Sequence, residues 1–483
     1  MNEDLPDGWV TATGKDLFGF VTSGSRGWAK YYADRGPRFL RVGNLDRDTV
    51  ALDLRDVQNV NPPSGTEGAR TRVAQDDILI SITADVGMIA VVSDDIGEAY
   101  VNQHIALARP VGGYLPAYVG WYLASRDGGQ RQFHLLDRGV IKGGLSLDDI
   151  RGVEVPLPPL AEQRRIVAKV EELLAQVNAA KDRLAKVPAI LKRFRQAVLA
   201  AACSGKLTED FRTETTAIDV QAPTGWTLTR VEDLLLDAKY GTSAKCGYES
   251  KSGIPVLRIP NIAKGELDLG DLKFAPKESE DWAKLGVATG DILVCRTNGS
   301  LELIGKAAVV PNLDRPMSFA SYLIRLRFDQ RRLLPAYFHL FLTSPVGRNQ
   351  IEKRARTSAG QFNINLQILR DLEIPLPPIT EQAAIVERAQ QLLAQAATNE
   401  ASTAAATRCA TKIPQAILAK AFRGELVPTE AELALSEGRD YETAQQLLAR
   451  VRSAGNEDKP KAERPNKKPR SRSTESPRAS RRA

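Results

Sequence analysis

Arginine and asparagine recur together in short, turn-rich segments of this chain, and these residue types contact guanine and adenine edges in DNA. Arg41 and Asn44 stand in one such segment, and Arg258 and Asn261 stand 217 residues further on in a matching one. Other polar residues flank two matched glycines, Gly24 and Gly241: Ser23, Ser25, Arg26, Thr242 and Lys245. Glycine lets a backbone approach a phosphate closely, and the flanking side chains can donate hydrogen bonds to it. The pattern suggests binding to nucleic acid.

Two further groups of polar residues fit the same chemistry. Arg296 and Asn298 stand where the first half of the chain has Ile82 and Ala84. A second loop-rich region in each half carries Arg138, Lys142, Arg354, Arg356, Gln361 and Asn363. Any one of these residues taken alone is better explained as a solvated turn residue. Their recurrence in both halves favours a DNA-binding surface.

Catalytic motifs are sparse. The chain has no G-x-x-x-x-G-K-[ST] motif, so no ATP-driven motor is expected. Asn61-Pro-Pro-Ser64 resembles the base-flipping loop of amino-methyltransferases, but serine replaces the stacking aromatic residue and no glycine-rich cofactor loop is recognisable. Asp237 with Glu249 and Lys251 matches a nuclease metal cluster only loosely, and the three histidines are isolated in sequence. We expect neither a catalytic residue nor a metal site.

The strongest signal is an internal duplication. Leu5-Pro-Asp-Gly-Trp9 returns as Ala222-Pro-Thr-Gly-Trp226, and Leu115-Pro-Ala-Tyr118 returns as Leu334-Pro-Ala-Tyr337. Pro156-Leu-Pro-Pro159 followed by Glu162-Gln163 returns as Pro375-Leu-Pro-Pro378 followed by Glu381-Gln382. The period is far too long for a solenoid unit. Each copy is therefore predicted to be a domain followed by a long helix.

Local patterns predict the elements of each domain. In the first copy, short β-branched runs predict strands at residues 39–42, 78–83, 89–92, 105–108 and 153–157. The sequence pattern at residues 115–125 predicts a helix, with Pro116 in its first turn. The fold class is thus α+β, with two tandem mixed α/β domains in a pseudo-two-fold, duplicated chain.

After each Pro-Leu-Pro-Pro segment, apolar residues recur at steps of four and three, which predicts a coiled-coil seam. Its most apolar members are Ile166, Val170, Leu173, Val177, Leu184, Ile385, Leu392, Ile413 and Ile417. Packing of each helix on its own domain is the alternative, but the unbroken register favours a mutual coiled coil. Pro188 and Pro414 should kink or restart their helices, because proline lacks a backbone donor.

Charge and composition limit the classes of protein to which this chain can belong. The net charge is +7, but ten Lys/Arg and four Asp/Glu lie in residues 457–483, so the rest of the chain is nearly neutral. That basic, Pro- and Ser-rich tail is expected to be disordered and to add non-specific affinity for DNA. No long apolar run or signal peptide is recognisable, and the four cysteines are scattered, which fits a cytoplasmic protein without a membrane span.

The predicted organisation has seven parts. They are a first domain at 1–157, a long helix at 158–207, a linker at 208–222, a second domain at 223–376, a second long helix at 377–426, a short helical segment at 427–455 and the tail at 456–483.

The paired Pro-Leu-Pro-Pro-x-x-Glu-Gln motifs, the Gln-Ala-x-Leu-Ala segments at 196–200 and 415–419, and the two-copy layout resemble the specificity subunit of type I restriction-modification systems. The resemblance implies two target-recognition domains, each reading half of a bipartite site in double-stranded DNA, separated by two antiparallel helices that set the gap. It also implies one copy per complex, docked to two methyltransferase subunits and to motor-nuclease subunits. AdoMet, ATP and Mg²⁺ are then used by those partners and not by this chain. A self-contained adenine methyltransferase, or a restriction-methylase fragment, is the alternative function, and a purely structural coiled-coil scaffold is a third.

Overall fold

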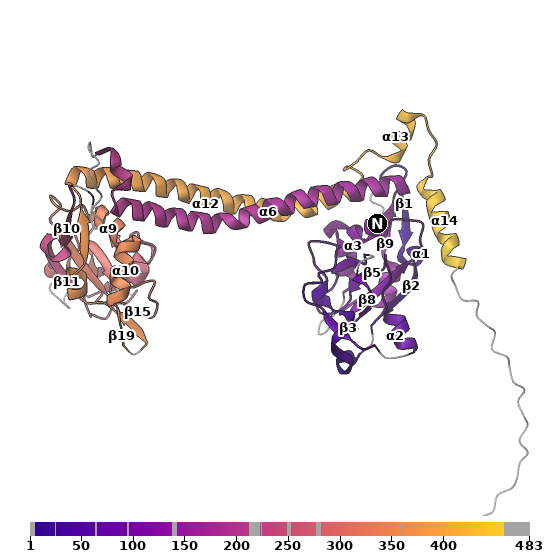
Figure 1. The fold of residues 1–483 in the computed structure, drawn as a ribbon, viewed down its shortest axis with the longest axis horizontal. Coiled ribbons are helices and arrows are strands. Elements are labelled where there is room, and N and C mark those ends of the chain that lie inside the picture. Colours follow the sequence, from indigo (N-terminus) through magenta and orange to yellow (C-terminus); the bar gives the residue numbers. More distant parts are fainter. Residues whose placement is uncertain are drawn as a thin grey trace, which may run out of the picture. The chain divides into compact units, whose positions relative to one another are not determined.

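The structure, a computed structural model, describes residues 5–24, 26–62, 65–93, 96–137, 143–211, 223, 225–248, 253–276, 282–358 and 360–457. Ser25, Arg138, Lys142, most of the predicted linker and nearly all of the basic tail lie outside these residues. The chain divides into two compact units, which Figure 1 shows as a ribbon. Unit 1 comprises Met1–Lys181 and Arg408–Ala483, and unit 2 comprises Asp182–Thr407.

Unit 1 begins with a mixed α/β domain. Its elements are β1 (Val10–Thr13), α1 (Gly14–Leu17), β2 (Phe18–Ser23), β3 (Tyr32–Leu40), β4 (Gln58–Val60), α2 (Thr66–Thr71), β5 (Ile78–Ser81), β6 (Ile89–Val91), β7 (Ala99–Val101), β8 (Ile105–Pro110), α3 (Pro116–Ala124), α4 (Arg131–Leu136), α5 (Leu147–Gly152) and β9 (Glu154–Leu157). The predicted strands and the predicted helix at 115–125 are confirmed in place and type, with bounds shifted by up to two residues, except that the first strand begins earlier, at Tyr32.

Unit 2 follows a similar order and also contains β15, β19 and β20. Its elements are β10 (Thr227–Arg230), β11 (Leu235–Tyr240), β12 (Ile254–Leu257), α7 (Ile259–Ile262), β13 (Lys273–Ala275), α8 (Trp282–Leu285), β14 (Ile292–Cys295), β15 (Thr297–Asn298), β16 (Ala307–Val309), β17 (Ser318–Phe319), β18 (Leu323–Phe328), α9 (Pro335–Thr343), α10 (Pro345–Arg354), β19 (Arg356–Ser358), β20 (Gln361–Asn363), α11 (Leu366–Arg370) and β21 (Glu373–Leu376).

A four-stranded antiparallel sheet divides the interior of each domain into two cores. Its order is β2–β8–β5–β6 in unit 1 and β11–β18–β14–β16 in unit 2. Along β5, Ile78 and Ile80 belong to one core and Leu79 to the other, because successive strand residues point to opposite faces. The first core also contains residues of α3, such as Tyr118, and the second contains residues of the three-stranded sheet β4–β3–β7, such as Leu40. Burial on both faces explains the continuous apolar runs in the sequence.

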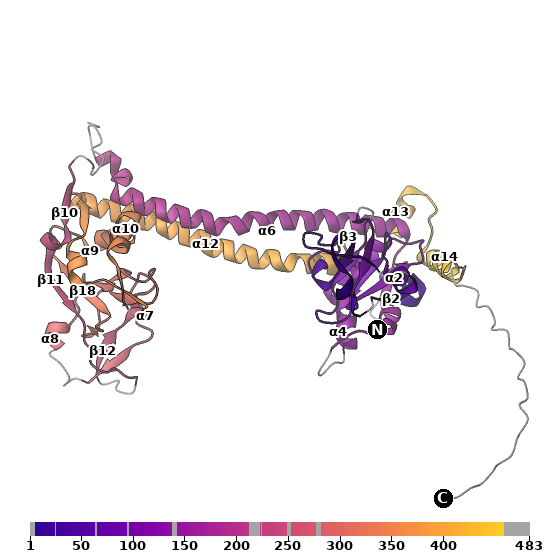
Figure 2. The same cartoon turned by 60° about the horizontal axis from the view of Figure 1, so that its bottom comes forward.

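Two long helices follow the domains: α6 (Leu160–Cys203) and α12 (Ile379–Phe422). In unit 1 the last turns of α12 share the core of the first turns of α6, and in unit 2 the last turns of α6 share the core of the first turns of α12. Arg195 and Glu400 form an ion pair across them at 2.5 Å in unit 2. Figures 1 and 2 show the helices side by side within each unit, in antiparallel orientation.

Most members of the predicted seam are buried or half-buried, but the helices also pack on their own domains. Ile166, Val170 and Ile385 are almost fully buried in domain cores, which fits the alternative reading at the start of each helix. Ile413 is 41% exposed, so its assignment to the seam is wrong; the neighbouring Ala410 and Pro414 face inward at that turn. Pro188 and Pro414 each lie inside one continuous helix, so a restart at either proline is wrong, while a kink there stays a prediction.

The repeated Glu-Gln pair fastens each long helix to its domain. The Glu162 carboxylate accepts a hydrogen bond from the Trp9 indole at 2.8 Å, and Glu381 accepts one from Trp226 at 3.0 Å. Burial raises the pKa of Glu162, although hydrogen bonds from the Glu430 backbone and from Trp9 act in the opposite direction.

The adjacent glutamine completes this attachment. Gln163 accepts from the backbone of Leu115, at the start of α3, and donates to the Pro158 carbonyl. Gln382 makes the corresponding bonds to Leu334 and Pro377. The duplicated motif therefore has a structural role that its spacing alone did not reveal.

Replacing Gln163 with leucine should weaken unit 1 alone. The change removes the partners of two part-buried or buried backbone groups, and each unsatisfied group costs about 1–3 kcal/mol. Amide hydrogen exchange on the intact chain should show faster exchange in α3 and in the first turns of α6, with unit 2 unchanged. Gln382→Leu is the matched control and should give the mirror result; equal loosening of both units by either variant would contradict the assignment.

A C-terminal segment covers part of unit 1. It contains α13 (Glu430–Glu437) and the amphipathic α14 (Ala444–Glu457), which buries Leu447 and Val451 in the first core. Arg452 of α14 pairs with Asp16 of α1 at 2.9 Å. Unit 1 thus needs both ends of the described chain. Within the described residues, no helix has the length and apolarity that crossing a membrane requires.

Candidate nucleic-acid interface

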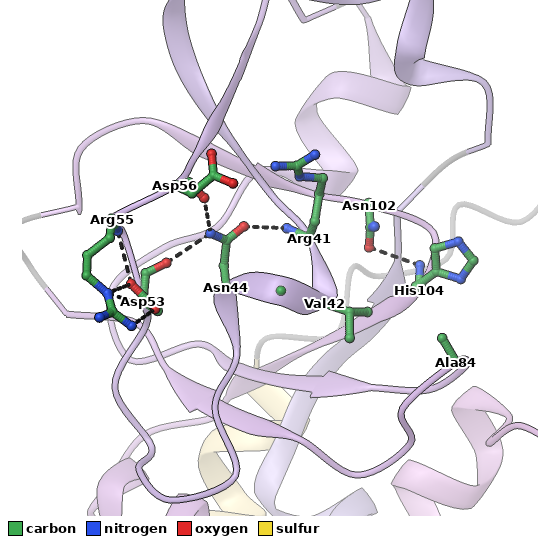
Figure 3. Close-up of a pocket in the computed structure, with 10 residues that line it drawn as sticks. Arg41, Val42, Asn44, Asp53, Arg55, Asp56, Ala84, Asn102 and His104 are labelled. Atoms are coloured by element: carbon green, nitrogen blue, oxygen red, sulfur yellow. Dashed lines mark hydrogen bonds and ion pairs between the residues drawn. The ribbon is translucent and has the colours of Figure 1, made fainter. Parts of the chain in front are cut away.

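A buried asparagine shapes the turn that follows β3. Asn44 ends the short 3-10 helix η2 (Val42–Asn44), and its side-chain oxygen accepts a hydrogen bond from the Arg41 backbone at 2.9 Å. Its amide nitrogen donates to the carbonyl oxygens of Asp53 and Asp56 at 2.9 and 2.8 Å (Figure 3). Because all of these partners are backbone groups, the turn and the following loop are fixed to each other independently of the neighbouring side chains.

Unit 2 repeats this arrangement at α7. Asn261 accepts from the Arg258 backbone at 2.8 Å and donates to the carbonyl oxygens of Asp268 and Asp271 at 2.8 and 2.9 Å. Asn44 and Asn261 are only 1% and 2% exposed. The prediction that these two asparagines contact base edges is therefore wrong, because their hydrogen-bonding groups are used in holding the loops.

The matched glycines also have a structural explanation. A Cβ atom at Gly24 would lie 2.1 Å from the Val101 carbonyl oxygen, and one at Gly241 would lie 2.2 Å from that of Phe319. The close approach that glycine permits is thus to the protein's own backbone and not to a phosphate. Thr242 is buried, and its hydroxyl accepts from the Ala244 backbone at 2.9 Å, so its assignment to the DNA surface is wrong as well.

An open pocket of about 700 Å³ lies beside the η2 turn of unit 1. Its lining includes Arg41, Asp56, Ala84, Asn102 and His104. In the view of Figure 3, Arg41 stands between Asp56 on one side and Asn102 and His104 on the other. Among the described residues, no ion pair or hydrogen bond engages the Arg41 guanidinium. The pocket therefore presents a cation on a rigidly held turn.

Hydrogen bonds fix the His104 ring. Its Nε2 accepts from the Gln103 amide at 2.8 Å, so the ring proton of the neutral form sits on Nδ1, which lies 2.5 Å from the Thr83 hydroxyl. The His104 backbone N–H donates to the Asn102 side-chain oxygen at 3.1 Å. Both His104 ring nitrogens are thus used within the protein, whereas no described residue forms a hydrogen bond with the amide nitrogen of Asn102, which is 8% exposed and lines the pocket.

Backbone hydrogen bonds identify the equivalent positions in unit 2. The Ile82 N–H donates to the His104 carbonyl at 2.9 Å, and the Arg296 N–H donates to the Tyr322 carbonyl at 3.0 Å. Arg296 thus replaces Ile82, and Tyr322, which is 57% exposed, replaces His104. The two units share one backbone frame at this surface but carry different side chains on it.

The arginines of unit 2 are more constrained than Arg41. Arg258 pairs with Asp271 at 2.9 Å and lies over the Tyr248 ring. Arg296 lies over the Tyr240 ring, with its guanidinium carbon 4.7 Å from the ring centre, and donates to the Ser321 carbonyl. Stacking on an aromatic ring leaves the remaining edge of a guanidinium available to a base or a phosphate.

A small sheet of unit 2 gathers several predicted residues. In the order β15–β20–β19, Asn298 lies on β15, Gln361 and Asn363 on β20, and Arg356 on β19. The Asn363 side chain accepts a hydrogen bond from Thr297, and the Asn298 side chain accepts one from the Ser300 backbone. Gln361 and Arg356 are exposed, as are Arg354 of α10, Arg26 and Lys245. Ser23 ends β2 and is partly buried.

Sequence reasoning missed Asn102, His104 and Tyr322. His104 is isolated in sequence because its pocket neighbours come from the η2 turn, the loop after it and the segment after β5, which are distant along the chain. Aligning the two duplicated halves places His104 opposite Tyr322. The alignment would have shown that the residue type differs there while the side chain carries a ring in both halves.

Known proteins match this chain over both halves. The family model described as the type I restriction modification DNA specificity domain matches residues 67–189 and 223–408. The specificity subunit of the type I restriction enzyme EcoKI from Escherichia coli is 31% identical over 87% of this chain and 90% of its own length. That of StySPI from Salmonella potsdam is also 31% identical, with the same coverage.

A solved structure shows the same fold. The crystal structure of the HsdS subunit from Thermoanaerobacter tengcongensis has a TM-score of 0.60 to this chain, with 20% sequence identity, and the match covers 88% of this chain and 99% of that one. Two mixed α/β domains with long intervening helices are therefore an arrangement that an experimentally solved protein also adopts.

Proposed function

Because the chain belongs to the family of type I restriction-modification specificity subunits, we propose that it recognises a bipartite, asymmetric DNA site, one half in each unit. The observation that carries this proposal is the shared backbone frame at Ile82 and His104 in unit 1 and at Arg296 and Tyr322 in unit 2, on which the two units present different side chains. Because the same backbone frame carries different side chains in each unit, each unit can recognise a different half-site of the same DNA duplex.

The partners follow from the same membership. The chain would dock two methyltransferase subunits and motor-nuclease subunits, as one copy per complex, and would itself be non-catalytic. AdoMet, ATP and Mg²⁺ would be used by those partners. The long helices offer docking surface, since most side chains in the middle of α6 and α12 are exposed. A cytoplasmic complex is consistent with four cysteines that are all free thiols.

Replacing Arg296 with alanine should relax only one half of the recognised site. A well-placed arginine contributes about 1–3 kcal/mol of discrimination between bases, so its loss should lower selectivity at one position by roughly 5- to 150-fold. The complex should be assembled with its methyltransferase subunits and its methylated adenines mapped by sequencing. Arg331→Ala is the charge-matched control, because Arg331 is an exposed residue of the same unit paired with Asp329.

Three outcomes of that experiment would count against the proposal. A contiguous recognition sequence, loss of selectivity in both half-sites from Arg296→Ala, or adenine methylation by the purified chain without partners would each contradict a bipartite, non-catalytic recognition subunit. The third outcome would favour the self-contained methyltransferase instead.

A further inference from the structure

Two equivalently placed arginines differ in their ionic surroundings. Arg41 and Arg258 both precede the turn held by the buried asparagine, and the backbone of each donates to that asparagine. The Arg258 guanidinium donates to both the carboxylate and the carbonyl oxygen of Asp271. Asp56 is the counterpart of Asp271, because each offers its carbonyl oxygen to the asparagine amide. Among the described residues, Asp56 forms no ion pair with Arg41. The same position is therefore a neutralised pair in unit 2 and an unpaired cation in unit 1.

The pocket around Arg41 offers hydrogen-bond donors that can bind the major-groove edge of a purine base. The pocket lined by Arg41, Asn102 and His104 is open to solvent and about 700 Å³ in volume. The guanidinium presents donors in a planar fork, the Asn102 amide nitrogen, which no described residue engages, adds another donor, and the His104 ring lines the same pocket. Guanine presents two acceptors, O6 and N7, on its major-groove edge, and arginine, like lysine, can donate to both, in its case from a rigid planar group. Adenine presents one acceptor and one donor there, which would leave part of the fork unsatisfied.

We propose that Arg41 reads a guanine in the half-site of unit 1, with Asn102 and His104 beside it, and that Arg258 reads no base in the half-site of unit 2. This inference rests on the proposed function, and it adds the identity of one base and an asymmetry between the units. Arg258 instead shapes its own loop, because its charge is already satisfied by Asp271. Unit 2 presents Arg296 and Tyr322 on the corresponding frame.

The test compares the two arginines in the assembled methylation complex. Methylated adenines are mapped for the wild type, Arg41→Ala and Arg258→Ala, and the wild-type map gives the two half-sites. Arg41→Ala should relax one guanine position of a single half-site, with a ten-fold or greater loss of selectivity there. Arg258→Ala, which removes the same charge from the equivalent position, should leave both half-sites unchanged.

A second measurement addresses the atom that Arg41 contacts. Each guanine of the relaxed half-site is replaced in turn with 7-deazaguanine, which lacks the N7 acceptor. Wild-type complex should lose several-fold in affinity at one guanine, and the Arg41→Ala complex should lose nothing further at that guanine. An equal loss of affinity on 7-deazaguanine substitution in the wild-type and Arg41→Ala complexes would overturn the inference. So would a methylation map in which Arg41→Ala leaves the half-site of unit 1 unchanged. A changed half-site with Arg258→Ala would overturn it too.

These failures differ from a failure of the proposed function. If the complex methylates bipartite sites but Arg41→Ala changes nothing, only the inference is wrong. If the wild-type complex recognises no bipartite site, the proposed function itself is wrong. Arg41→Lys adds a folding control, since it keeps the charge and the backbone bond to Asn44 but loses the planar fork. It should bind DNA and keep more selectivity for the guanine than Arg41→Ala does.

Discussion

Asp237→Ala should destabilise unit 2 by about 3 kcal/mol, because it leaves a buried cation without its main partner. Arg325 is 2% exposed and forms an ion pair with Asp237. Its remaining acidic neighbour, Asp291, is 3.9 Å away and already accepts two hydrogen bonds from Arg327. The loss should appear as faster amide exchange in β11 and β18 of the intact chain, because global unfolding of a two-unit protein is not a single transition.

Unit 1 supplies the control for this variant. The strand registers place Phe20 and Leu107 where unit 2 has Asp237 and Arg325. The double variant Asp237→Phe, Arg325→Leu should therefore be markedly more stable than Asp237→Ala, because an apolar pair can replace a buried ion pair at little cost. If the double variant is as unstable as the single one, the unpaired charge is not the cause.

The effect of Asp237→Ala should also depend on pH. Burial alone would raise the pKa of Asp237, but the hydrogen bond and the charge of Arg325 outweigh it and hold the pKa below its ordinary value of 3.8. A carboxylate with a lowered pKa stabilises the folded state above 3.8 and loses that contribution as the pH falls through the folded-state value. The difference between wild type and Asp237→Ala should therefore shrink in strong acid and stay constant above about pH 5.

Lengthening both long helices by matched heptads should lengthen the gap between the two half-sites. The Arg195–Glu400 ion pair places residue 195 opposite residue 400, so antiparallel counting puts the 189/190 bond opposite the 405/406 bond. Residues Ala189, Ile190, Ala405 and Ala406 are exposed, so insertions there leave the domain cores intact. Seven residues in each helix add about 10 Å, which is close to three base pairs. Twenty-one residues add about 31 Å, which approaches one turn of DNA.

The two insertions should differ in affinity. A gap longer by three base pairs turns the second half-site by roughly 100° around the duplex, because a full turn takes about 10.5 base pairs. The seven-residue complex should thus bind weakly to a site with a longer gap, and the twenty-one-residue complex should bind more tightly to a gap longer by about nine base pairs. Methylation mapping gives both gaps; an unchanged gap in an active complex would mean that the helices do not set the distance.

The duplication made most of the fold predictable. Repeated Trp, Glu and Gln residues at a near-constant offset indicated two like domains, and short β-branched runs such as Ile78–Ser81 located their central strands. The heptad pattern located both long helices. It could not show that Ile166 and Ile385 pack on their own domains, because the same apolar spacing serves either partner.

The surface that faces a ligand was harder to predict. Asn44 and Asn261 have the residue type of a base-reading side chain, but residue type does not show that backbone carbonyls nine and twelve, or seven and ten, positions away use the amide. Asp237 was considered for a metal site, yet it pairs with Arg325, 88 residues away, and Glu249 and Lys251 lie outside the described residues. Long-range pairing of this kind leaves no local pattern in the sequence.

The composition of unit 1 has a consequence for how the chain matures on the ribosome. Its first core needs Leu418, Ala421 and Leu447, which are synthesised only after the whole of unit 2. At about 5–20 residues per second, that interval is on the order of ten to fifty seconds. During this time Ile166 and Val170 have no C-terminal partner, so nascent unit 1 exposes apolar surface that a chaperone can bind. Unit 2 is contiguous in sequence and can close its core first, although it is made second.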